Sequence, residues 1–149
     1  MTLHQRGEVA DPNAIDPDQD LLVSWTEFEH GGPDPNGVID DLIFVIMGNC
    51  LGVKTVHSGH AFGNSFLTYA AKEFTIPAES LQGGQTFQVE IEFSEMDTDR
   101  WRDLTSIITY AASTFLDIRT TGTNEEDIIC PAQPLAMDGG QTDRKKPGG

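Results

Sequence analysis

Short runs of alternating apolar and polar residues, separated by clusters of Gly, Pro, Asn and Asp, extend along most of the chain. In the clearest run, residues 86–94, every second residue from Phe87 to Phe93 is apolar and the residues between them are polar or charged. A period of two predicts a β-strand with one buried face. Helical periodicity is nearly absent, so the pattern predicts an all-β chain.

Other segments extend this pattern. Residues 20–28 predict an early strand, and residues 42–47 are apolar on both faces, which is typical of a strand in the middle of a sheet. Residues 106–120 predict a long closing strand with a bulge or bend near residues 111–113. The charged residues 95–105 predict a loop before that last strand.

The order of these features resembles a fibronectin type III module. Trp25 lies in an early strand as a core anchor, and residues 81–87 are similar to that family's turn before its sixth strand. In this turn Leu81 would pack inward, a Gly would make the turn, and Phe87 stands where family members usually carry the Tyr of the tyrosine corner. The resemblance implies a single antiparallel β-sandwich of about seven strands, fibronectin type III-like or immunoglobulin-like.

A chain of 149 residues is long enough for one core and too short for two ordinary domains. We expect residues 1–8 to be a disordered N-terminal segment and residues 9–120 to form the β-sandwich domain. Residues 121–136 would be a C-terminal extension of that domain. Residues 137–149 are rich in Gly and charged residues and would be a disordered tail or linker.

Charge excludes two classes of partner. The 9 Lys and Arg against 24 Asp and Glu give a formal net charge of −15, which repels nucleic acid and anionic membranes. The longest apolar run, residues 38–50, is interrupted by charged and polar residues, so we expect no membrane insertion. The first residues lack a secretory signal, and we expect the signal of an extracellular or cell-envelope protein to lie upstream of this chain.

A candidate ligand site follows from the predicted strand order. Alternating strands would bring the loops at residues 29–38, 58–71 and 95–105 to one end of the sandwich. Imidazole, aromatic and carboxylate side chains gather there, as in a sugar- or cation-binding patch. The candidate ligand-binding residues are His60, Asp97, Asp99 and Trp101. The alternative is that these loops are simply polar and that Trp101 folds back over the rim of the core.

The same strand order places Cys50 and Cys130 near the opposite end of the sandwich. A disulfide between them would staple the extension at residues 121–136 to the domain. In the chain-entropy model such a bond contributes about 4 kcal/mol. The alternative, two unpaired cysteines in a reducing compartment, stays open.

Motifs of catalytic or cofactor chemistry are not recognisable in the sequence. It contains no Gly-x-Ser-x-Gly elbow, phosphate loop or dinucleotide fingerprint. Residues 16–20 imitate the acidic spacing of a calcium loop, but Leu21 stands where the sharp turn needs Gly. We therefore expect no metal, no other cofactor and no enzymatic activity.

These observations predict a non-catalytic extracellular module that spaces, supports or mediates adhesion in a larger protein. Its partners would be neighbouring domains, an extracellular protein or a glycan, and the chain would be a monomer or a weak homo-oligomer. The alternative is a carbohydrate-binding module that uses Trp101 and neighbouring loop residues. A small hydrolase is a third hypothesis, for which no nucleophile beside a base is recognisable.

Overall fold

The computed structural model describes residues 1–49, 54–59 and 66–123. These residues form two antiparallel sheets, and no helix occurs in the described ranges. The first sheet has the order β2-β1-β3-β7 and contains β1 (Thr2–Gln5), β2 (Glu8–Val9), β3 (Leu21–Ser24) and β7 (Glu73–Ile76). The second has the order β5-β4-β8-β9, with β6 also paired to β4, and contains β4 (Leu42–Asn49), β5 (Lys54–His57), β6 (Leu67–Thr68), β8 (Thr86–Trp101) and β9 (Leu104–Arg119).

The two sheets share one hydrophobic core, which confirms the all-β architecture and is consistent with a β-sandwich. From the first sheet the core takes alternate residues such as Leu21 and Val23. From the second it takes the alternate residues of β8 from Phe87 to Ile91. Because strand side chains alternate between the two faces, each sheet keeps its remaining side chains outside this core.

Two details expected for the early strand and the turn are confirmed. Trp25 is nearly buried, and its indole Nε1 donates a hydrogen bond of 3.0 Å to the carbonyl of Ala71. Leu81 and Phe87 are both buried in the core. Between them Gly84 has a φ of +71°, a conformation that favours glycine and allows the chain to turn into β8.

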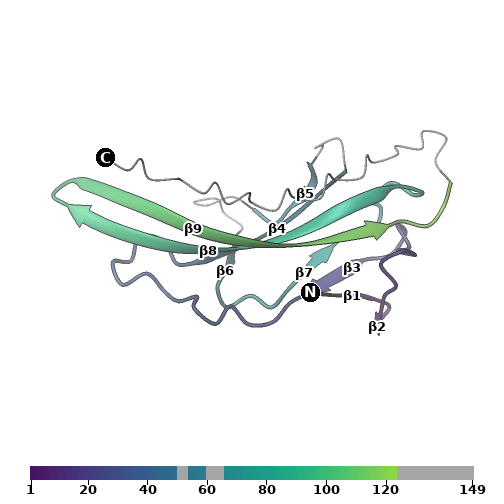
Figure 1. Cartoon of the computed structure of the whole chain (residues 1–149), viewed down its shortest axis with the longest axis horizontal. Coiled ribbons are helices and arrows are strands. Elements are labelled where there is room, and N and C mark those ends of the chain that lie inside the picture. The colour runs from purple at the N-terminus through teal and green to yellow at the C-terminus, as the bar shows by residue number, and fades with distance from the viewer. Residues whose placement is uncertain (50–53, 60–65, 124–149) are drawn as a thin grey trace, which may run out of the picture.

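The sheets differ greatly in length. The longest strand of the first sheet has 4 residues, whereas β8 and β9 have 16 residues each. The β8–β9 hairpin therefore extends far beyond β1, β3 and β7, which lie near the opposite end of the molecule from its tip (Figure 1). We call residues 86–93 the proximal half of β8 and residues 94–101 its distal half.

Three expectations need correcting. Residues 1–8, expected to be disordered, instead contribute β1 and β2, because Leu3 reaches the core and β1 pairs with β3. Residues 95–105, expected to be a loop, form the distal half of β8, a tight turn and the start of β9. The bulge expected near residues 111–113 does not form, since the β8–β9 register is continuous from Thr86↔Arg119 to Trp101↔Leu104.

Candidate functional site

Three of the four candidate ligand residues lie on one surface of the distal hairpin, by which we mean the distal half of β8 and residues 104–111 of β9, which pair with it. Asp97, Asp99 and Trp101 are alternate residues of β8, so their side chains share a face, and all three are exposed. They belong to a paired strand and not to the expected loop. His60 lies outside the described residues, so its place beside the others stays a prediction.

The tip of the hairpin exposes a large aromatic surface. Trp101 is 62% exposed, and the guanidinium carbon of Arg102 lies 4.6 Å from the centroid of its ring. Leu104, which pairs with Trp101 across the hairpin, is 65% exposed. The two-residue turn between the strands places Arg102 at a φ of +56°. The tip therefore presents an indole, an aliphatic side chain and a cation together.

A loop at residues 29–41 supports the distal half of β8. The carboxylate of Asp41 accepts hydrogen bonds from the amide of Gly32 at 2.8 Å and from the amide of Met96 at 2.6 Å. Asn36 donates its side-chain amide to the carbonyl of Thr98 at 2.7 Å. β4 pairs with β8 only as far as Ser94, so beyond that point polar side chains of the loop take over the edge of β8. The segment before β4 runs along this part of the hairpin in Figure 1.

Asp34 anchors this loop. Its carboxylate accepts hydrogen bonds from the Thr98 hydroxyl at 2.7 Å and from the amides of Asn36 at 3.0 Å, Val38 at 2.6 Å and Ile39 at 3.2 Å. Desolvation alone would raise the pKa of Asp34. The four hydrogen bonds together have a larger effect in the opposite direction, and they lower the pKa from 3.8 to about 2. Asp34 is therefore an ionised acceptor within the loop, and its oxygens already have partners.

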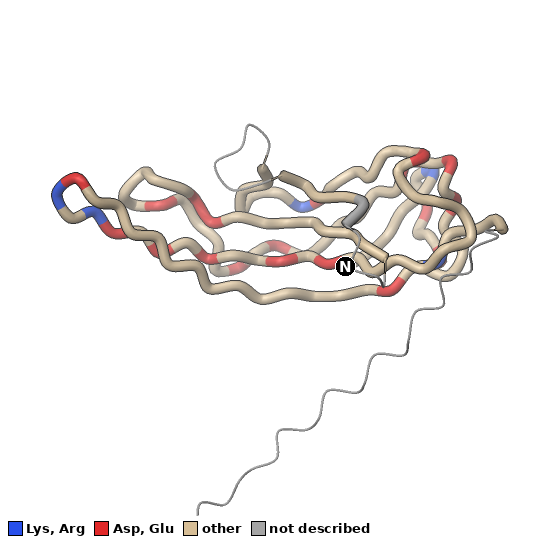
Figure 2. The backbone as a smooth tube through the Cα atoms, turned by 90° about the horizontal axis from the view of Figure 1, so that it is seen from above, with Lys and Arg blue, Asp and Glu red and all other residues tan. Residues whose placement is uncertain are grey.

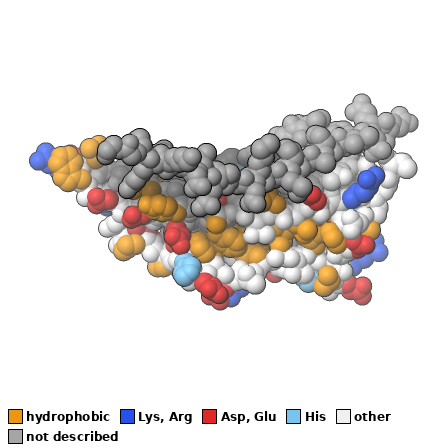
Figure 3. All heavy atoms as spheres, viewed as in Figure 1, with side chains coloured by type: hydrophobic (Ala, Val, Ile, Leu, Met, Phe, Trp, Pro, Cys, Tyr) orange, Lys and Arg blue, Asp and Glu red, His pale blue; other side chains and the backbone are white. Residues whose placement is uncertain are grey.

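Among the described residues, β9 carries most of the large exposed apolar side chains. It is exposed along nearly its whole length, from Leu104 to Phe115. Its large exposed hydrophobic residues are Leu104, Ile107, Ile108, Tyr110 and Phe115. Hydrophobic side chains gather at the tip of the hairpin, at the left of Figure 3. The sequence analysis missed this surface, although the absence of any charged residue from position 104 to position 116 was a visible signal.

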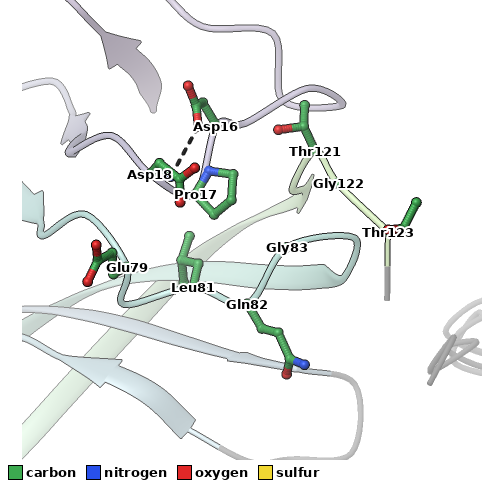
Figure 4. A pocket seen from close by; sticks show the side chains of 10 residues that line it. All are labelled: Asp16, Pro17, Asp18, Glu79, Leu81, Gln82, Gly83, Thr121, Gly122 and Thr123. Carbon is green, nitrogen blue, oxygen red and sulfur yellow. Dashed lines mark hydrogen bonds between the residues drawn. The ribbon is translucent and has the colours of Figure 1, made fainter. Parts of the chain in front are cut away.

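A separate pocket lies near the start of β8. It has a volume of about 390 Å³ and is lined by residues around Pro17, Leu81 and Gly122. Figure 4 shows Leu81 pointing toward Pro17 and Gln82 pointing away from it. Asp16 at its rim already binds the guanidinium of Arg6 at 3.0 Å and accepts the amide of Asp18 at 3.1 Å. The carboxylate of Asp16 in this acidic pocket is therefore already bonded within the chain.

Further sequence expectations fall partly or wholly outside the described residues. The extension at residues 121–136 is described only as far as residue 123, and the tail at residues 137–149 is not described. Cys50 and Cys130 are not described either, so their pairing stays a prediction. Within the described ranges, no group of three or more His, Cys, Asp or Glu side chains is arranged to hold a metal ion. In the same part of the chain, no helix is long and apolar enough to cross a membrane.

The chain was compared with known proteins at three levels. A scan against protein-family models finds no match. Comparison with curated proteins and with solved structures finds no significant match either.

Proposed function

We propose that this chain is a fibronectin type III-like or immunoglobulin-like module of a larger protein. In immunoglobulin-like sandwiches, strands A, B and E are neighbours in one sheet, and strands C, F and G are neighbours in the other. In chain order β1, β3 and β7 correspond to A, B and E, while β4, β8 and β9 correspond to C, F and G. β5 lies beside β4, where the variable type adds strand C′. This order of neighbours supports the proposal.

The function we propose for the module is non-catalytic and based on protein binding. It spaces, supports or mediates adhesion in a protein of the cell envelope or the extracellular space, and it binds through the β8–β9 hairpin. The observation that carries this proposal is the length of that hairpin, whose two 16-residue strands extend far beyond the 4-residue strands of the other sheet. A hairpin so long is not needed to cover the core.

The exposed side chains of the hairpin support the same function. Soluble proteins rarely expose a contiguous apolar surface unless it binds something. Ile108 is 51% exposed and Tyr110 is 60% exposed on one face of β9, and Phe115 is exposed on the other face. Aromatic side chains such as those of Tyr110 and Phe115 are enriched in protein interfaces, and tyrosine is among the residues that contribute most to binding.

Photo-crosslinking tests this function in cells that produce the full-length protein. A photoreactive phenylalanine derivative replaces Tyr110 on the hairpin or, as the matched control, Val9, which is 72% exposed on the first sheet. We expect protein cross-links from position 110 and few from position 9. Equal cross-linking from both positions, or none from position 110, would contradict binding through the hairpin.

A carbohydrate-binding module is the second candidate, and one observation favours it. The exposed ring of Trp101 shares a face with the carboxylates of Asp97 and Asp99. A flat aromatic ring can stack on a sugar, while neighbouring carboxylates accept hydrogen bonds from its hydroxyl groups. This candidate uses only the tip of the hairpin, whereas the first candidate uses the length of β9.

A further inference from the structure

The outer edge of β9 has a row of backbone groups without partners among the described residues. At the end of β9 the amide of Thr120 donates to Gln85 beside β8 at 2.9 Å. The backbone groups of Arg119, the next residue toward the tip, point away from β8. Its amide donates to the carbonyl of Pro12 at 2.7 Å, and its carbonyl accepts from the amide of Ile15 at 2.9 Å. The direction alternates along a strand, and the β8–β9 register is continuous. Odd-numbered residues from Thr105 to Asp117 therefore point their N–H and C=O groups outward.

Within the described residues, this edge lacks the features of strand length, sequence and register by which proteins block strand pairing, and no described helix or loop covers it from residue 105 to residue 117. Natural edge strands are kept short or carry Lys, Pro or a bulge. The other described edges are short, since β2 and β6 have 2 residues each and β5 and β7 have 4 each. β9 has 16 residues in unbroken register, and residues 104–116 contain no charge and no proline.

The charge pattern indicates which partner fits. The chain has a formal net charge of −15, yet its long free edge is uncharged over 13 residues between Asp103 and Asp117. Figure 2 shows this strand as a tan tube along one side of the molecule, next to β8 with its carboxylate positions in red. Tyr110 is the midpoint of the uncharged run. An antiparallel copy of the strand, centred on the same residue, would thus meet it without placing any charge within the ladder.

We propose that two copies of this chain associate by antiparallel pairing of β9 with β9 about a two-fold axis at Tyr110. This inference rests on the proposed function, because it names the partner that the hairpin binds. In this register Thr109 faces Ala111 of the second copy, and Ile108 faces Ala112. Moving the centre by one residue would shorten the uncharged part of the ladder from 13 to 11 residues, so the length of the uncharged run selects the register centred on Tyr110. In this register Asp103 of one copy faces Asp117 of the other just beyond each end of the uncharged ladder.

The backbone groups match this register. Both Thr109 and Ala111 point their backbone groups outward, so they form a hydrogen-bonded pair, as do the other odd-numbered residues between positions 105 and 115. Six such pairs give about 12 hydrogen bonds, since each pair exchanges two. A typical protein interface has about 10 hydrogen bonds. The ladder alone therefore supplies the hydrogen bonding of a specific interface, and the apolar side chains of β9 add to it.

Sedimentation of the purified 149-residue chain, at about 0.15 M salt and over a range of concentrations, tests the proposal. We expect a monomer–dimer equilibrium. Ala111→Pro removes an outward N–H that β8 does not use, so the variant should fold and its dimer Kd should rise by about tenfold or more. Circular dichroism and thermal unfolding check that this variant keeps its fold.

A charge pair tests the register. Thr109→Glu and Ala111→Lys each place like charges close together across the two-fold axis, and each should weaken the dimer several-fold. The double variant T109E/A111K sets the introduced carboxylate of one copy against the introduced ammonium of the other and should restore the wild-type Kd. Thr2→Glu, at an exposed threonine of β1, is the matched control and should leave the Kd unchanged.

Several outcomes would overturn the proposal. A wild-type chain that stays monomeric at all concentrations would overturn it, whatever else binds to β9. A dimer that Ala111→Pro leaves intact would do so as well, and so would a double variant no stronger than its parents. The proposed function fails differently: a monomeric chain whose position 110 still cross-links a different protein in cells would remove the second copy and keep the binding hairpin.

Discussion

The two halves of β8 show how one strand can serve two purposes. In the proximal half, the alternate residues Phe87, Val89 and Ile91 are buried against the first sheet. In the distal half the same face carries Asp97, Asp99 and Trp101, all exposed. The pairing with β9 does not change between the halves. The first sheet therefore decides which part of the β8 face is buried, whereas β9 supplies the backbone pairing along the whole strand.

The halves also differ in what stabilises them. Apolar contacts between the sheets stabilise the proximal half, whereas carboxylates and amides of residues 29–41 stabilise the distal half from the side. Apolar burial is non-directional and nearly independent of pH, but hydrogen bonds to a carboxylate depend on its ionisation. Substitutions and pH should therefore affect the two halves differently.

The largest expected effect is the loss of core packing in the proximal half. Ile91 is 1% exposed, so Ile91→Ala leaves a cavity and should lower the free energy of unfolding by about 2–5 kcal/mol. Ile108→Ala in the distal hairpin, at a half-exposed site, should change it by no more than about 0.5 kcal/mol. Urea unfolding, at concentrations where the chain is monomeric, measures both. Similar losses for the two variants would mean that the distal hairpin is also part of the core.

The sequence predicted the proximal half well because burial leaves a periodic pattern. Alternation from Phe87 to Phe93 identified the strand, and the apolar residues 42–47 identified its neighbour β4. The distal half was predicted as a loop because its charged residues resemble loop composition. The pattern of apolar residues shows where one face of a strand is buried. β8 continues past the end of the first sheet, which buries its proximal half, so the pattern ends before the strand does.

The candidate site could be predicted only in part for the same reason. Asp97, Asp99 and Trp101 share one exposed face of β8, but they belong to a paired strand and not to the expected loop, and a ligand site there stays a prediction. The role of Asp34 depends on a contact with Thr98, 64 positions away in the sequence, which no local pattern encodes. The open edge of β9 depends on which strand has no neighbour among the described residues, and this is a property of the topology.

A smaller effect should follow from acidification of the distal half. The pKa of Asp34 lies at about 2 in the folded chain, below its ordinary value of 3.8. The folded state therefore holds the ionised form more strongly, and this stabilisation is complete above pH 3.8 and is lost as the pH falls toward 2. Amide hydrogen exchange at Val38 and Ile39 should accelerate, relative to the intrinsic rate, over this interval.

Two controls separate this local effect from general acid unfolding. The amide of Ile91 in the proximal half should keep its protection until the whole chain unfolds. Asp34→Asn removes the titrating group, so the amides of Val38 and Ile39 should lose their pH dependence in this interval. Parallel loss of protection at Ile91 and Val38 in the wild type would show that the two halves unfold together.

A small effect on stability is also expected at the tip, where the two functional candidates can be distinguished. Trp101→Ala removes an exposed ring and its contact with Arg102, so the free energy of unfolding should change by less than about 1 kcal/mol. Titration of a glycan panel, followed by tryptophan fluorescence, then tests the ring as a sugar platform. Trp25 is nearly buried and provides a constant background signal. Glycan binding that Trp101→Ala abolishes would favour the carbohydrate-binding candidate, because no sugar contact is needed for association through β9.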